Sequence, residues 1–217
     1  MSSYDMKKIV LLSRKSFLAK IQTHIAKIEI NKIKKNLIDI HYSSSVGDKD
    51  LSAKAWEQHG FGIFTNSLSK KLVLKEADVV VHSYKDLPVK NLNKTSFVCL
   101  KRDDPRDIIL IKRSSLNKKK LVIGTSSPRR KYYLKKLKEF LPFQELKSIQ
   151  IRGNVPSRLE KVLNSSKEDG LFIAKAAIDR ILKYGQKIDK KEYKNFRLNF
   201  EKFENTWDIV ISGNRPN

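Results

Sequence analysis

Residues 121–130 read LVIGTSSPRR, and this stretch decides the fold class. Its first half is apolar and β-branched, which is typical of a buried strand. Ser127 and Pro128 are residue types preferred at the N-cap and at the first position of a helix. The buried face of that helix is expected at Leu134, Leu137 and Leu141. A strand that leads directly into a helix is the building unit of α/β folds.

The same alternation recurs along the rest of the chain. Before this stretch, helices are expected to begin at Ser16 and to pass through Leu68 and Leu72, and strands are expected at residues 8–13, 37–42 and 77–81, the last of them fully buried. After it, helices are expected to begin at Pro156 and to span residues 176–184, and strands are expected at residues 148–151 and 170–174. Strands that alternate with helices predict an α/β architecture with mainly parallel sheets.

A polar stretch that contains proline, Lys101–Pro105, is the expected crossing between two domains. The prediction is a first α/β domain over residues 1–100 and a second α/β domain over residues 101–200. Residues 201–217 would then begin a return toward the first domain. Two compact domains joined in this way are expected to form a cleft between them.

The net charge of +23 at pH 7 favours an anionic partner such as nucleic acid, a membrane surface or a polycarboxylate. The alternative is a lysine-rich solvated surface, because the lysines are spread along the chain without a basic tail or interleaved aromatic residues. No apolar run approaches the roughly 18 residues that a membrane-spanning helix needs, and the first residues lack a signal-peptide core. We therefore expect a cytoplasmic protein that binds neither membrane nor nucleic acid.

Cys99 is the single cysteine of the sequence. One cysteine excludes an intramolecular disulfide framework and a cysteine-based zinc cluster, so no metal site is expected. Its neighbours Phe97, Val98 and Leu100 are apolar, and Cys99 is therefore expected to be a small buried hydrophobic residue.

Arginines stand at the junctions where predicted strands give way to predicted helices. In α/β sheets, helix N-termini at the carboxyl ends of strands direct unpaired N–H groups toward anions. The planar guanidinium group of arginine pairs with a carboxylate through two parallel hydrogen bonds. Any one of these arginines alone would be an ordinary surface residue, but their recurrence in both predicted domains favours a ligand with several carboxylates. They are Arg14, Arg129, Arg130, Arg152 and Arg158.

Residues 82–88 read HSYKDLP and directly follow a predicted strand. Asp86, kept ionised by Lys85, could stabilise a developing cation or transfer a proton in a partly dry cleft. Equally, Asp86 could be a turn residue before Pro88 with Lys85 as its surface partner, and the spacing does not decide between these alternatives. His82 could be a base, but a packing histidine at a strand end is the favoured interpretation.

Together these stretches resemble the porphobilinogen deaminases. The resemblance begins at Ser13–Ala19, and blocks in the same order carry it along the chain to about Arg180. These blocks are residues 62–65, 77–88, 102–107, 124–130 and 151–159. The resemblance implies two periplasmic-binding-protein-like domains with a cleft between them. In the family a small third α+β domain follows, and it carries a dipyrromethane cofactor on a cysteine.

The resemblance also implies a function, that of a hydroxymethylbilane synthase in tetrapyrrole and haem biosynthesis. Such a transferase condenses four porphobilinogen units stepwise into a linear tetrapyrrole and releases ammonia. By this likeness Asp86 is the catalytic aspartate, which stabilises cationic intermediates. The family residues that hold the carboxylates of the cofactor match Ser83, Lys85, Thr125, Ser127, Arg129, Arg130 and Arg152. The family residues around the substrate and the growing chain match Arg14, Ser16, Gln22, Arg158 and Arg180. The expected partners are porphobilinogen and its linear products, bound by a monomer.

The sequence departs from the family pattern in two places. It ends at Asn217, before the family's Gly-Gln-Gly block and cofactor cysteine, so the expectation is a C-terminally truncated chain without the third domain or the anchoring thiol. The family usually has lysine at the positions of Phe61 and Asn66, where two cationic contacts of an active-site loop are missing. The alternative to the enzyme is therefore a truncated, non-catalytic polycarboxylate-binding protein, and nucleic-acid binding ranks last.

Overall fold

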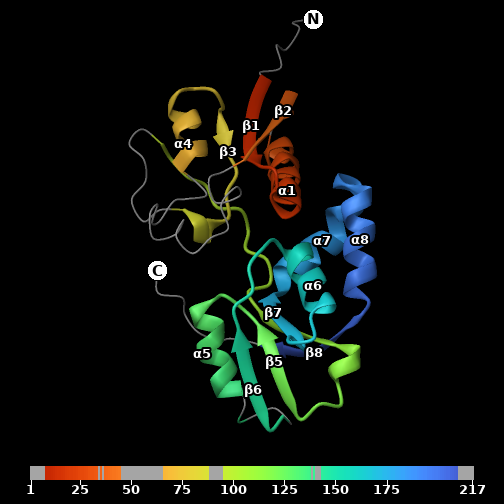
Figure 1. The fold of residues 1–217 in the computed structure, drawn as a ribbon. Coiled ribbons are helices and arrows are strands. Elements are labelled where there is room, and N and C mark those ends of the chain that lie inside the picture. The colour runs from red at the N-terminus through yellow and green to blue at the C-terminus, as the bar shows by residue number, and fades with distance from the viewer. Residues whose placement is uncertain are drawn as a thin grey trace, which may run out of the picture. The chain divides into compact units, whose positions relative to one another are not determined.

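The computed structural model describes residues 8–33, 35, 37–44, 66–87, 95–137, 139 and 143–209. The chain divides into two compact units, Met1–Arg102 and Asp103–Asn217, and each unit has its own sheet. Figure 1 shows unit 1 in red to yellow and the sheet of unit 2 in green to blue. None of the described helices is long and apolar enough to cross a membrane.

Unit 1 contains a three-stranded parallel sheet in the order β2-β1-β3. Its elements are β1 (Lys8–Arg14), α1 (Phe17–Ile33), β2 (Leu37–Ser43), α4 (Asn66–Val73), β3 (Val79–Val80) and the 3₁₀ turn η1 (Tyr84–Asp86). The helix predicted to begin at Ser16 is confirmed, because the Ser16 carbonyl oxygen accepts a hydrogen bond from Lys20 N at 2.9 Å. The strands predicted at residues 8–13 and 37–42 are confirmed as β1 and β2.

The core of unit 1 lies on both sides of the central strand β1. Leu12 packs with Leu68 of α4 and with Ala77. Leu11 points to the opposite face, because side chains alternate along a strand. Helix α1 contacts β1 and buries Phe17 and Ile21. Both faces of β1 are therefore covered.

The prediction of a fully buried strand at residues 77–81 is wrong. Only Val79–Val80 is strand, and Val79 is 37% exposed. The physical reason is the place of β3 at an edge of the sheet, where it pairs with β1 alone among the described strands. Asp78, which directly precedes β3, adds a side-chain bond to β1: its Oδ2 accepts a hydrogen bond from Val10 N at 2.8 Å.

Unit 2 contains a five-stranded sheet in the order β6-β5-β7-β4-β8. Strand β5 pairs in parallel with β6 and β7, whereas β4 pairs antiparallel with β7 and β8. The elements are β4 (Asp107–Lys112), the 3₁₀ turn η2 (Arg113–Ser115), β5 (Lys120–Gly124), α5 (Pro128–Leu137), β6 (Glu145–Ile149), α6 (Val155–Asn164), β7 (Gly170–Ala174), α7 (Lys175–Ile188), α8 (Lys190–Phe200) and β8 (Phe203–Ile209). The α/β class is confirmed. The prediction of mainly parallel sheets is confirmed too: four of the six strand pairs are parallel, and the two antiparallel pairs of β4 make the sheet of unit 2 mixed.

Strand β4, helix α8 and strand β8 lie outside the predicted elements. All six residues of β4 are buried, so the strand has no alternation of apolar and polar residues to mark it. Helix α8 packs beside α7 in Figure 1, and β8 then pairs with β4. Helices α6 and α7 contact β7, and α5 contacts β6.

One hydrophobic core joins β4, β5, β7 and α5. It contains Ile109, Ile111, Leu121, Ile123, Leu134 and Phe172. Gly170, at the start of β7, allows the two antiparallel strands to approach, because a Cβ at this position would lie 2.5 Å from the Leu110 carbonyl oxygen of β4.

Asp169, which directly precedes β7, is buried and fully hydrogen-bonded. Its Oδ1 accepts from Ser115 Oγ at 2.8 Å and from Lys118 Nζ at 2.7 Å, and its Oδ2 accepts from Val122 N at 2.9 Å. Burial raises the pKa of Asp169, but hydrogen bonds from Lys118, the Val122 N–H and Ser115 together lower the pKa below its ordinary value. This carboxylate therefore joins three segments of unit 2 and stabilises it most in the ionised form.

Replacing Asp169 by Asn is expected to destabilise unit 2 by about 1–3 kcal/mol at pH 7, because the new amide NH₂ faces the buried Val122 N–H or the Lys118 ammonium. A carboxyl whose pKa is lower in the folded than in the unfolded state stabilises the fold above the unfolded pKa of about 3.9. This contribution is lost as the pH falls through the folded pKa. Urea unfolding of both proteins from pH 7 to pH 2.5 measures the difference, which must shrink below about pH 4. A difference that stays constant with pH would contradict the assignment.

Residues 95–106 are described and form neither helix nor strand. Cys99 is exposed, and its neighbour Val98 is 91% exposed. The expectation that Cys99 is buried is therefore wrong, because its apolar run is not paired as a strand within the described part of the chain.

The chain enters unit 2 through a group of ion pairs with helix α7. Asp103 accepts a hydrogen bond from Arg180 Nε at 2.6 Å. Asp104 accepts from the Arg106 backbone N at 3.0 Å and from its guanidinium group, and these bonds, the side-chain bond first, hold the pKa of Asp104 well below its usual range. The Arg106 carbonyl oxygen in turn accepts from Lys175 N at 3.0 Å, at the start of α7. The first residues of unit 2 are thus fixed to its own helix.

Candidate functional site

Four predicted site positions of unit 1 follow the carboxyl ends of its strands: Arg14 ends β1, Ser16 precedes α1, Gln22 lies on α1, and Ser83–Asp86 follow β3. Gln22 of α1 and Ser83 contact each other: Gln22 Nε2 donates to Ser83 Oγ at 3.0 Å, and Gln22 Oε1 lies 3.2 Å from the same hydroxyl. By family likeness, Gln22 was expected to contact the substrate and Ser83 the cofactor. The structure brings the two together and joins α1 to the segment that carries Asp86.

Asp86 is positioned by a single 3₁₀ turn. Asp86 N donates to the Ser83 carbonyl oxygen at 2.9 Å, and Leu87 N donates to the Tyr84 carbonyl oxygen at 3.2 Å. Asp86 is half-buried, whereas Lys85 is exposed. The turn therefore places a carboxylate at the surface of unit 1 with its backbone held on the residue that contacts Gln22.

His82 lies where β3 ends, beside β1. Burial, and then the positive charge of Arg14, lowers the pKa of His82 to about 4. Its Nε2 is buried, and no residue in the described part of the chain forms a hydrogen bond with it. His82 is therefore neutral at pH 7 and a weak base, which supports the interpretation as a packing histidine.

In unit 2, hydroxyl groups organise the junction between β5 and α5. Ser127 Oγ accepts from Arg130 N at 3.4 Å, which confirms the predicted N-cap. Thr125 is buried, and its Oγ1 accepts from Ser127 N at 3.3 Å. Both hydroxyl groups thus support the first turn of the helix that carries Arg129 and Arg130.

Arg129 and Arg130 share one buried carboxylate. Arg129 Nη2 donates to Asp107 Oδ2 at 2.5 Å, and Arg130 Nη2 donates to Asp107 Oδ1 at 2.8 Å. The side chain of Asp107 is 2% exposed, against 35% for Arg129 and 14% for Arg130. Asp107 belongs to the sequence block at residues 102–107, but no role was predicted for it. No local pattern marks Asp107, because β4 is buried on both faces and its partners Arg129 and Arg130 lie 22 and 23 positions later.

The loop before α6 brings Arg158 into the same region. Gly153 has a φ of 125°, which favours glycine, and Asn154 caps the helix by accepting from Ser157 N at 2.9 Å. Arg158 Nε donates to the Gly153 carbonyl oxygen at 2.6 Å. Burial, and then the charge of Arg130, lowers the pKa of Arg158. Arg130 and Arg158, assigned separately to cofactor and substrate, therefore affect each other.

The other two predicted arginines of unit 2 differ in position: Arg152 belongs to the loop before α6, next to Ile151, whose carbonyl oxygen accepts a hydrogen bond from Ser126 Oγ, whereas Arg180 lies farther along the chain. Arg152 precedes Gly153 and is half-buried, and its carbonyl oxygen accepts from Lys161 Nζ at 3.0 Å. Arg180 lies on α7 and pairs with Asp103. The family residues at Phe61 and Pro88 are outside the described residues, as is the side chain of Asn66.

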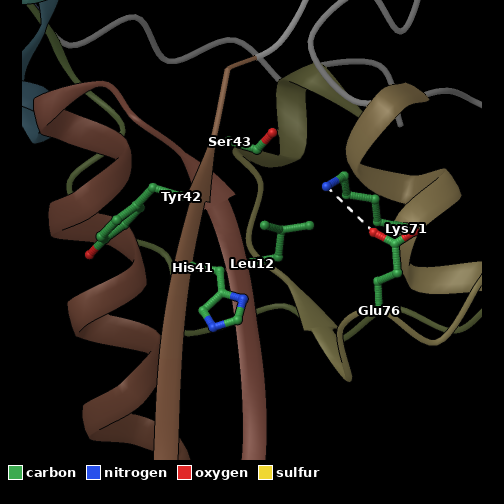
Figure 2. A pocket seen from close by; sticks show the side chains of 6 residues that line it. All are labelled: Leu12, His41, Tyr42, Ser43, Lys71 and Glu76. Carbon is green, nitrogen blue, oxygen red and sulfur yellow. Dashed lines mark ion pairs between the residues drawn. The ribbon is translucent and has the colours of Figure 1, made fainter.

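A pocket of about 430 Å³ lies elsewhere in unit 1 (Figure 2). Figure 2 shows an ion pair across one side, in which Lys71 Nζ lies 3.4 Å from Glu76 Oε2. None of the predicted site residues lines this pocket, whose lining residues are Leu12, His41, Tyr42, Ser43, Lys71 and Glu76. The charges at the strand ends, rather than this hollow, define the candidate site. Across the described residues, no group of three or more His, Cys, Asp or Glu side chains could hold a metal ion.

Fold and site define a two-unit α/β protein in which arginines cluster at a helix N-terminus, as is suited to binding an anion. A family model described as "Porphobilinogen deaminase, dipyromethane cofactor binding domain" matches residues 9–201. The chain belongs to the porphobilinogen deaminase family.

Relatives agree with this assignment. The porphobilinogen deaminase of Ruminiclostridium cellulolyticum is 36% identical over 178 residues, which cover 81% of this chain and 59% of that protein. The probable porphobilinogen deaminase of Picrophilus torridus is 36% identical over 195 residues, which cover 88% of this chain and 63% of that protein. The chain thus spans about three fifths of the length of these relatives. A structure from a study of glutathione import by Streptococcus mutans matches at a TM-score of 0.36 and 10% identity, covering 91% of this chain and 89% of that one.

Proposed function

We propose that this chain takes part in the stepwise condensation of four porphobilinogen units into hydroxymethylbilane with release of ammonia. The observation that carries the proposal is the pair of Arg129 and Arg130 on the carboxylate of Asp107, together with Arg158, whose charge interacts with that of Arg130. Porphobilinogen carries an acetate and a propionate group, and each added unit increases the negative charge of the product. A site with excess positive charge suits such a ligand.

Unit 2 would bind the carboxylates. Guanidinium groups present planar pairs of N–H donors to carboxylates, and the hydroxyl groups of Thr125 and Ser127 lie at the same helix start. This donor set fits a dipyrromethane, which would supply the pyrrole to which new units are added. Arg129, Arg130, Arg152 and Ser127 are the residues proposed to hold it. The exposed Cys99 lies outside the family's cysteine motif and is not assigned as its anchor.

Unit 1 would supply the catalytic group. Loss of ammonia from porphobilinogen produces an electron-poor pyrrole with positive charge on its nitrogen. Asp86, half-buried on its 3₁₀ turn, would stabilise that charge as an ionised carboxylate and accept hydrogen bonds from pyrrole N–H groups. Gln22 and Ser83 would fix the turn from α1.

Binding is tested by calorimetry with porphobilinogen. We expect heat of binding with the wild-type chain, and Arg130→Gln is expected to weaken the affinity about tenfold or more, because a charge-assisted hydrogen bond to a carboxylate is lost. Arg197→Gln is the matched control, since Arg197 lies on α8 and pairs only weakly at the surface with Glu201. Absence of heat with the wild type contradicts the proposal. Binding without any ammonia release under assay conditions would favour the non-catalytic polycarboxylate-binding protein instead.

A further inference from the structure

We propose that Asp107 is the positioning residue of the arginine pair: it holds Arg129 and Arg130 side by side, so that their remaining N–H groups are presented together to one ligand. The two arginines take one carboxylate oxygen each, at 2.5 and 2.8 Å. Asp107 itself is fixed, because it begins the fully buried strand β4 and lies opposite Ala174 in the pairing with β7.

The contact geometry leaves donors available. A guanidinium group has five N–H donors in one plane, and each arginine has one Nη2 hydrogen bond to Asp107. Arg130 lies over the ring of Phe172, with its Cζ 5.9 Å from the ring centroid, which restricts the guanidinium plane. Its Nε is buried and has no hydrogen-bond partner among the described residues.

Charge explains why the pair needs Asp107. Two guanidinium groups on successive residues repel each other, and Arg158 adds a third positive charge that interacts with Arg130. A buried charge that loses its partner is strongly unfavourable, so the arginines would move apart and toward solvent without this carboxylate. With it, they are ordered before any ligand arrives, and a ligand does not have to supply the free energy of ordering them.

The inference rests on the proposed function only for the identity of the ligand. Its first test therefore uses the ligand-free chain. Arginines are labelled with phenylglyoxal, and the rate at each site is followed by mass spectrometry. Asp107→Asn is expected to raise the rates at Arg129 and Arg130 about tenfold, which corresponds to the loss of a charge-assisted hydrogen bond. The rate at the exposed Arg197 should not change.

Asp169→Asn is the matched control. Like Asp107, Asp169 is a buried aspartate of unit 2 that accepts several hydrogen bonds. Its partners, however, are Ser115, Lys118 and Val122, and not the two arginines. A merely structural role of Asp107 predicts the same rise in labelling for both variants, and that result overturns the proposal. Unchanged labelling in Asp107→Asn overturns it too.

A measurement on the wild type tests the proposal even if Asp107→Asn folds poorly. Arginine side-chain NMR of the ligand-free chain should show slow rotation of the Arg129 and Arg130 guanidinium groups and fast rotation at Arg197. Fast rotation at all three sites would refute the proposal.

The second test adds porphobilinogen. Its affinity for Asp107→Asn should fall about tenfold, whereas Asp107→Glu, which keeps the charge, should recover part of the loss. If porphobilinogen fails to bind the wild type, the proposed function fails, and the labelling and NMR results alone decide the role of Asp107. If porphobilinogen binds the wild type and Asp107→Asn equally well, the positioning role of Asp107 is wrong, but the proposed function stands.

Discussion

On the proposed function, replacing Asp86 by Asn is expected to reduce the rate of porphobilinogen consumption by about 10²- to 10⁴-fold, with little change in the stability of unit 1. The amide has nearly the shape of the carboxylate, and the hydrogen bonds that form the turn come from the backbone of Ser83, Tyr84, Asp86 and Leu87. The substitution therefore removes the negative charge and leaves its support. Ammonia release measures the rate, and circular dichroism measures the fold.

Asp39→Asn is the control for this experiment. Asp39 is an exposed carboxylate of the same unit that pairs with Lys8 and His41 on the sheet surface. Its loss should leave the rate within a factor of about two, because exposed ion pairs contribute little. Full activity of Asp86→Asn would show that Asp86 is only a turn residue, the alternative that its spacing left open.

Replacing Gly170 by Ala is expected to destabilise unit 2 by about 3 kcal/mol or more and to lower its melting temperature by more than about 10 °C. The added methyl group would lie 2.5 Å from the Leu110 carbonyl oxygen, 3.0 Å from Ile123 Cδ1 and 3.3 Å from Ile111 Cα. Two of these atoms belong to the backbone of β4, which is fixed between β7 and β8. The strands must separate, since no side-chain rotation relieves the contact.

Gly124→Ala provides the comparison. A Cβ at Gly124 would meet the Cγ2 atom of Ile151 at 3.0 Å, and that side chain can shift. We expect a cost of about 1 kcal/mol, measured by the same thermal unfolding experiment. Equal melting temperatures for the two variants would contradict the proposed close approach of β4 and β7.

Local signals explain what the sequence predicted well. Ser127 and Pro128 act within the first turn of the helix that they begin. Their role as helix start can therefore be predicted from neighbouring residues. The same holds for Ser16 before α1. Asp107 could not be found this way, because its partners lie 22 and 23 positions later and meet it only when β4 and α5 pack in one unit.

Sheet position accounts for most of the errors. Val79 reads as a buried residue in an apolar run, but an edge strand has one open side. Strand β4 was not predicted as an element, but it becomes the strand between β7 and β8. Neither the order of strands nor their direction is encoded in a local pattern, and Cys99 likewise lacks the pairing that its apolar neighbours suggest. The predicted cleft and the domain ranges remain predictions.

The ion pairs at the start of unit 2 determine where a shortened gene that encodes this unit alone should begin. A start codon placed at Asp107 would still encode every strand of the five-stranded sheet. It would nevertheless remove Asp103 from Arg180 and the Arg106 carbonyl from the first turn of α7. It would also place a positively charged amino terminus next to Asp107, the residue that pairs with both arginines. A shortened gene for unit 2 should therefore begin no later than the codon for Asp103.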